Sequence, residues 1–370
     1  MRPSESWSTW LAVAVMVCGG ATAAWGEAPR YVTTTGALAI ENLDHRIALQ
    51  RADAGVGELL LLRARFLSDY DALDRASTLA EERSRTAGDL LERARARSAV
   101  HRFAEALTDL DAAGKDDEAS SDLRASILVA TGHASEAISR LEARVAQRPG
   151  YASRSALAGA YAAVGRFTDA DRLYSEALAD LDTTSPFPYA WIYFARGVMW
   201  AEQAGDPARA EPLYARALAH LPEFAMANVH LAELEAARGD VASAMTRLER
   251  VVASTHEPEA LALLGTLHLR TGAPVRGRSE ITAARERFEA LLVRQPLAFA
   301  DHAARFYLGP GADPERAWVL AQQSLEGRQT ASAFTLAIEA ARATGRECEA
   351  CVLVEASRAR GLPVPGDGCP

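Results

Sequence analysis

Glycines recur along this chain at a nearly constant spacing. Six of them divide its middle and C-terminal parts: Gly132, Gly165, Gly205, Gly239, Gly272 and Gly345. The intervals between them are similar, except for a longer one after Gly165 and one of about double length before Gly345. Apolar residues at steps of three and four on both sides indicate helices, so each glycine marks a turn between two helices. One helical hairpin is too small to bury its own apolar face, so the spacing predicts a stack of hairpins.

The stretch 151–178 (YASRSALAGAYAAVGRFTDADRLYSEAL) shows this pattern most cleanly. The longer interval that follows it contains 183–188 (TTSPFP), whose prolines and hydroxyls predict a longer loop. The interval of double length contains a degenerate unit near 309–311. An alanine five positions beyond most of the glycines lets the paired helices approach closely, and Gly277 replaces it in the 258–295 unit.

Two neighbouring units carry a recognisable motif. The first contains Leu157, Ala158, Tyr161, Gly165, Phe167, Ala170, Tyr174 and Ala177, and the second Tyr193, Gly197, Trp200, Ala210, Tyr214, Ala217, Leu218 and Pro222. They resemble the tetratricopeptide repeat, a 34-residue unit with the pattern W-x2-L-G-x2-Y, A-x3-F and P. The resemblance implies an all-α fold, a right-handed superhelical solenoid of antiparallel helix pairs with a concave inner face.

The predicted organisation has four parts. Residues 1–26 form a signal peptide, and 27–53 form an N-terminal segment with a capping helix. Residues 54–360 form the repeat array, with about nine units that are clearest over 118–258. Residues 361–370 form a tail rich in proline and glycine.

The N-terminus is typical of an export signal. Arg2 precedes a short apolar run, Trp10–Val17, and small residues suited to cleavage before Glu27 end the segment. We therefore expect a periplasmic or secreted protein with no membrane insertion after cleavage. An uncleaved membrane anchor and a lipidated Cys18 remain as alternatives.

Charge and motifs argue against several classes of function. The net charge is −9 and no run of lysine or arginine occurs, so neither nucleic acid nor an anionic membrane is expected as the main partner. Phosphate-binding, hydrolase and zinc-protease motifs are absent from the sequence. We expect no enzymatic activity, no cofactor and no metal site. His230 and His268 are expected to be surface or partly packed side chains on first helices.

Cys348 and Cys351 form the one motif with chemical potential, a C-x-x-C pair. It lacks the strand pattern of a thioredoxin-like site and the further ligands of a zinc site. A structural disulfide involving two of Cys348, Cys351 and Cys369 is the favoured interpretation, with redox chemistry or metal binding as alternatives.

Partners of the repeats that this chain resembles usually lie along the concave face made by the first helices. The unit after residue 183 carries the densest aromatic cluster of the chain. Beside its core stripe lies a second apolar stripe, which the next first helix continues: Trp191, Phe194, Val198, Met226 and Val229. A helix that is apolar on two faces either offers a groove or is covered by the chain itself, for instance by 183–188.

The leading functional hypothesis is an exported, non-enzymatic scaffold that binds a peptide or protein segment of unknown identity in the concave groove. One alternative is a thiol redox module that uses Cys348 and Cys351. Another is a membrane-attached accessory protein for envelope assembly or export.

Overall fold

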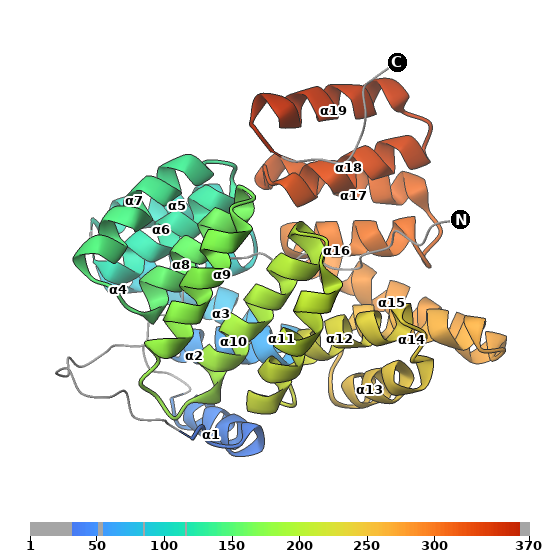
Figure 1. Ribbon diagram of the computed structural model, residues 1–370, viewed down its shortest axis with the longest axis horizontal. Coiled ribbons are helices and arrows are strands. Elements are labelled where there is room, and N and C mark those ends of the chain that lie inside the picture. The colour runs from blue at the N-terminus through green and yellow to red at the C-terminus, as the bar shows by residue number, and fades with distance from the viewer. Residues whose placement is uncertain (1–31, 51–54, 84–85, 115–116, 363–370) are drawn as a thin grey trace.

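The computed structural model describes residues 32–50, 55–83, 86–114 and 117–362. These residues form nineteen α-helices and one π-helical turn, and no strand occurs among them (Figure 1). Consecutive helices pack against each other in pairs, which confirms the predicted all-α solenoid. The predicted signal peptide, and all but two residues of the predicted tail, lie outside the described residues.

One helix precedes the pairs, α1 (Gly36–Leu49), and it falls within the segment expected to carry a capping helix. Nine consecutive pairs follow: α2 (Val56–Leu67) with α3 (Tyr70–Arg83), α4 (Ala87–Ala99) with α5 (Phe103–Ala113), α6 (Glu118–Ala130) with α7 (Ala134–Gln147), α8 (Tyr151–Ala163) with α9 (Phe167–Ala179), α10 (Pro186–Val198) with α11 (Pro207–His220), α12 (Ala225–Ala237) with α13 (Val241–Ser254), α14 (Pro258–Arg270) with α15 (Pro274–Arg294), α16 (Pro296–Leu308) with α17 (Pro314–Gly327), and α18 (Ala331–Ala343) with α19 (Glu347–Ala359).

The turns within the pairs use the predicted glycines. All six have a positive φ, between 68° and 93°. Residues with a Cβ rarely adopt this conformation, so glycine ends the first helix and lets the second begin two residues later. Asp206 and Asp313 cap second helices, because each side chain accepts a hydrogen bond from the backbone N–H three residues on.

The predicted loop at 183–188 is partly wrong. The connection between α9 and α10 covers 180–185, and Pro186 already stands in the first turn of α10. Proline fits there because the N–H that it lacks would have no partner within the helix. A π-helical turn, η1 (Met199–Gln203), then extends α10. The extra residues of this longer repeat therefore lie in two places, the connection before α10 and the π-helical turn after it.

At Gly277, α15 approaches the backbone of α14 closely. A Cβ at this position would lie 2.6 Å from the carbonyl oxygen of Gly265 and 2.9 Å from the backbone nitrogen of Leu269. These are backbone atoms of α14, which cannot move aside as a flexible side chain can. The departure from the alanine of the other units therefore has a packing reason.

The first three pairs fold back onto the later ones. In Figure 1, α2 and α3 lie behind α10 and α11 in the middle of the molecule. Phe66, at the end of α2, is fully buried, with ring centroids 5.1 Å from Phe187 and 4.7 Å from Phe224. We call this contact between the turns of the first three pairs and the starts of α10, α12, α14, α16 and α18 the seam.

Polar contacts continue the seam. The Tyr70 hydroxyl donates to the Glu257 carboxylate at 2.5 Å, and its ring packs edge-on against Phe299 at 4.9 Å. At the third turn, the backbone N–H of Gln329 donates to the carbonyl of Ala130 at 3.2 Å. Each of these contacts joins one of the first three pairs to one of the last three, so the array is closed by its own first units.

Buried ionisable groups line the same contact. His101 is 3% exposed, and its Nδ1 lies 3.1 Å from the Leu297 carbonyl. Nearby, Arg328 pairs with Asp301, and His302 Nδ1 lies 2.6 Å from Glu259. Burial lowers the pKa of His101 to about 3, and the charge of Arg328 adds to this effect. His101 is therefore neutral in the folded chain.

We predict that Gly277→Ala destabilises the chain. The new methyl group must push α14 and α15 apart, at a cost of about 1–3 kcal/mol in the free energy of unfolding. Urea denaturation followed by circular dichroism measures this loss. Gly57→Ala is the matched control, because a Cβ added there would have no atom within 4 Å and alanine favours the helix. Equal stability of the Gly277 variant and the natural chain would refute the packing argument.

We predict that His101→Asn reduces the loss of folding stability at acidic pH. The unfolded chain takes up a proton at residue 101 below about pH 6.5, whereas the folded chain does so only near pH 3. Histidine at this position thus costs stability as the pH falls from 6.5 toward 3, by roughly 2 kcal/mol at pH 5. Asparagine retains an N–H donor and tolerates the positive φ of 61°.

The measurement compares the urea stability of each protein at pH 7 and at pH 5. The loss between the two should be roughly 2 kcal/mol smaller for His101→Asn than for the natural chain. His45→Asn, at an exposed position on α1, is the control and should leave the loss unchanged. If His101→Asn loses as much stability between pH 7 and pH 5 as the natural chain, burial does not lower the pKa of His101 as proposed.

Candidate functional site

A cavity opens at the seam between two parts of the array. α2 and α3 form one wall, and α10 and α12 form the other. It encloses about 730 Å³, part of which is continuous with solvent. Its lining is mostly apolar, with Leu61, Ala64, Leu73, Phe194, Phe224 and Met226 among the wall residues. Its apolar lining is typical of sites that bind small molecules or inserted side chains.

The structure brings three of the five predicted binding residues into this cavity: Trp191, Phe194 and Met226. Trp191 is partly exposed, whereas Phe194 and Met226 are buried. Val198 and Val229 are buried at 1% exposure in the helix packing and do not line the cavity. Across the cavity from this stripe lie α2 and α3.

The opposite wall was not predicted from the sequence. Leu61, Arg65 and Tyr70 come from the first helix pair, whereas α10 belongs to the fifth. One signal for it exists. Four consecutive leucines, 59–62, place apolar side chains on every side of one turn of α2, which indicates burial on more than one side.

Among the described residues that line the cavity, Arg65 is the charged one. Its guanidinium carbon lies 4.8 Å from the centroid of the Trp191 ring, a cation–π distance. Burial lowers the pKa of Arg65 to about 10, so the side chain still carries its charge at neutral pH. The Ser68 and Tyr70 side chains also reach the lining, and the Tyr70 hydroxyl is engaged by Glu257 across the seam. The cavity is thus apolar with one cation in its wall.

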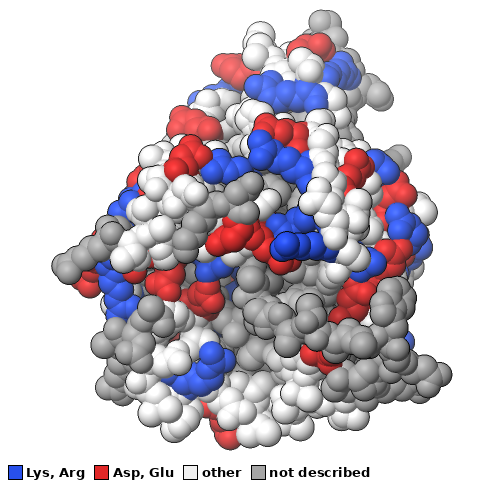
Figure 2. All heavy atoms as spheres, turned by 90° about the vertical axis from the view of Figure 1, so that its left-hand side faces the viewer, with Lys and Arg blue, Asp and Glu red and all other residues white. Residues whose placement is uncertain are grey.

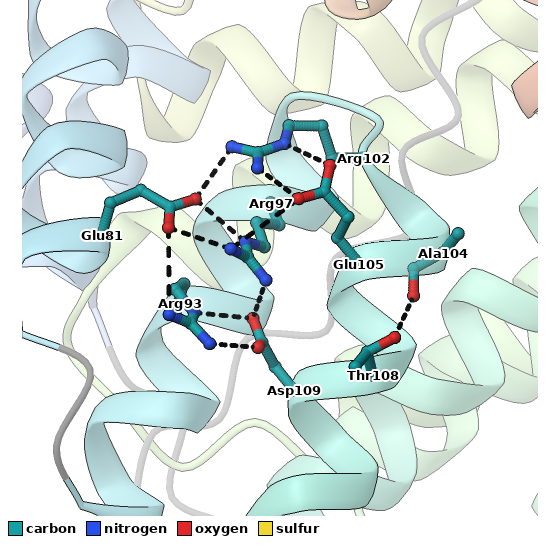
Figure 3. A network of polar contacts seen from close by, with 8 residues as sticks. All are labelled: Glu81, Arg93, Arg97, Arg102, Ala104, Glu105, Thr108 and Asp109. Carbon is teal, nitrogen blue, oxygen red and sulfur yellow. Dashed lines mark hydrogen bonds and ion pairs between the residues drawn. The ribbon is translucent and has the colours of Figure 1, made fainter.

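A second concentration of charge lies on α3, α4 and α5 (Figure 3). Three arginines and three carboxylates form it: Glu81, Arg93, Arg97, Arg102, Glu105 and Asp109. The buried Asp109 carboxylate accepts hydrogen bonds from Arg93 at 2.6 Å and from Arg97 at 2.9 Å. Hydrogen bonds from Arg97, and the charges of Arg97 and Arg102, lower the pKa of Glu81. Each arginine already has carboxylate partners, so the network ties three helices together and offers little to an external anion.

The surface beside this network has mixed charge. Figure 2 shows the side of the molecule where α4 and α7 lie, with acidic and basic side chains interleaved across it. Among the described residues visible in this view, neither sign forms a broad area.

The two histidines singled out in the sequence are buried rather than at the surface. His230 Nδ1 lies 3.2 Å from Glu202 and 3.3 Å from the Tyr214 hydroxyl, and burial lowers its pKa to about 3. His268 Nδ1 lies 2.6 Å from Glu280. Both are core groups with polar partners. Within the described residues, no cluster of three or more potential metal ligands occurs.

The cysteines do not form the pair that a redox site requires. Both C-x-x-C residues lie on α19, where Cys348 is free and exposed and Cys351 is disulfide-bonded. Cys369 lies outside the described residues. A disulfide between Cys348 and Cys351, one of the expected pairings, is therefore excluded in this structure.

The chain is similar to one protein family and to several solved structures. The profile of the tetratricopeptide repeat family matches residues 201–267. No curated protein matches the chain. Among solved structures, the Cut9–Hcn1 complex of the APC/C is 18% identical, with a TM-score of 0.46, over 84% of this chain and 61% of that one. The chain thus spans less than two thirds of that protein.

Two other solved structures are similar in the same range. YrrB, described as a repeat protein with an unusual peptide-binding site, is 14% identical with a TM-score of 0.36, over 53% of this chain and 94% of that one. Human IFIT1, solved as a dimer with m7Gppp-AAAA, is 15% identical with a TM-score of 0.44, over 90% and 79%.

The profile match covers the end of one helix pair, the whole of the next and the start of a third. The same hairpin, with its positive-φ glycine, recurs on both sides of it. Residues 201–267 are thus similar to the tetratricopeptide repeat, and the described helix pairs on both sides of them repeat the same hairpin.

Proposed function

We propose that the chain is an exported, non-enzymatic scaffold that holds a peptide or protein segment at the seam cavity. The fold itself supports a role in protein–protein interaction, since solenoids of this kind present extended surfaces to partners. The cavity is the observation that carries the finer proposal. It is an apolar opening between α2 and α10, and the partly exposed Trp191 lies in its wall.

The mode of binding follows from the burial of the wall residues. Phe194 and Met226 are covered by the chain, so a partner reaches them only by inserting a side chain between α10 and α2. An aromatic or branched aliphatic residue fits this role, because buried anchors of that kind dominate binding energy in protein interfaces. The rest of the segment would rest on the rim around Trp191.

Export rests on the N-terminal sequence. The apolar run at 10–17 and the small residues at 24–26 are typical of a signal peptide that is cleaved before Glu27. Among the described helices, none has the length and hydropathy to cross a bilayer. The proposed location is the periplasm or the medium, with the protein partner in the same compartment.

We predict that Trp191→Ala abolishes partner capture and leaves the helices intact. Loss of an anchoring ring at an interface costs about 2 kcal/mol or more, which weakens binding roughly 30-fold. The tagged full-length chain is expressed, recovered from envelope extract and analysed for co-purified proteins. Mass spectrometry of the recovered protein reads its first residue, which should be Glu27.

Trp191→Phe is the matched variant, because it keeps an aromatic ring in the cavity wall and should retain partner capture. Circular dichroism reports whether each variant keeps its helices. Melting of the array by Trp191→Ala would make the residue part of the core. Undiminished capture by that variant would refute the cavity as the binding site. An uncleaved N-terminus would refute export with cleavage of a signal peptide.

A further inference from the structure

The described lining of the seam cavity combines an apolar wall with one charged group, Arg65. Its apolar wall is formed by side chains from two distant parts of the chain, and the space between them opens to solvent. Tightly packed interiors rarely leave such space. An unfilled apolar space that communicates with solvent is the common form of a small-molecule site.

The positive charge of Arg65 in the cavity wall favours ligands that carry a negative charge. The Arg65 guanidinium lies against the Trp191 ring at 4.8 Å, beside the apolar surface of Leu61 and Ala64. A guanidinium has five N–H donors, so it can hold more than one partner at a time. A carboxylate can accept two of these hydrogen bonds side by side, and such charged pairs strengthen where water is excluded.

The two features select among small ligands. A purely apolar molecule would fill the space but would gain nothing from Arg65. A cationic amphiphile would place like charges side by side. An aliphatic chain that ends in a carboxylate satisfies both the apolar wall and the guanidinium.

We propose that the seam cavity binds a small amphipathic carboxylate, with its aliphatic chain among Leu61, Leu73 and Phe194 and its carboxylate on Arg65. This site does not depend on the proposed scaffold function. Because Trp191 belongs to both, the carboxylate and a protein segment would compete. The ligand would also stabilise the seam, because it would contact both the first units and the later ones.

Isothermal titration calorimetry on the full-length chain tests the site with three probes of equal chain length: octanoate, 1-octanol and octylammonium. Octanoate should bind about tenfold or more tightly than octanol, since a hydrogen bond to a charged group contributes about 1.5–3 kcal/mol. Octylammonium should bind most weakly. Octanol binding as tightly as octanoate would overturn the role of the charge.

Three variants locate the site. Arg65→Gln should weaken octanoate about tenfold and leave octanol unchanged, whereas Arg75→Gln, at an exposed position on α3, should change neither. Ala99→Phe fills the cavity from α4 without touching the charge and should abolish binding of both probes. Circular dichroism confirms folding of each variant. Octanoate binding that survives Ala99→Phe would place the ligand elsewhere.

Failure of this inference differs from failure of the scaffold proposal. If octanoate does not bind while Trp191-dependent capture of a protein persists, the carboxylate site is refuted and the scaffold stands. If octanoate binds and no protein is captured in a Trp191-dependent manner, the site stands alone. Weaker protein capture in the presence of octanoate supports a shared cavity.

Discussion

The contact of Phe66 with Phe187 and Phe224 closes this molecule. A repeat array needs only contacts between neighbouring units, and its ends need not meet. Here the first pair sends a fully buried aromatic ring into the fifth and sixth pairs. Burial of such a side chain contributes about 1.5–3 kcal/mol, which suffices to favour a closed over an open solenoid when further contacts follow. The Tyr70–Glu257 and Gln329–Ala130 hydrogen bonds supply these.

The packing of the first units against the later ones forms the cavity. In an open array, Trp191, Phe194 and Met226 would line a groove, whereas here α2 and α3 roof it and leave a cavity with Arg65 in its wall. The cavity therefore exists only as long as the seam holds. A ligand bound in the cavity, as proposed above, would contact both sides and stabilise the closed array by its binding free energy. Binding and closure would then be coupled through the same residues.

The local structure of the chain could be predicted from its sequence, because the information is local. Glycines that need a positive φ and apolar steps of three and four define the hairpins wherever they occur. The closure could not be predicted in this way. Phe66 and Tyr70 look like ordinary core residues of a first unit, and their partners across the seam belong to the fifth pair and beyond. Three of the five residues predicted to bind a partner line one wall of the cavity, whereas the wall with Arg65 was not predicted. Gly277 was noticed as a departure, and only the helix spacing explains it.

A double-mutant cycle between Phe66 and Phe224 tests closure most directly. Their rings lie 4.7 Å apart in an edge-to-face arrangement, and leucine at each position keeps an apolar side chain while removing the ring. The free energies of unfolding of the natural chain, Phe66→Leu, Phe224→Leu and the double variant give the coupling energy. A seam that forms in solution predicts a coupling of about 0.5–1.5 kcal/mol. Additive effects, with a coupling indistinguishable from zero, would contradict a closed array.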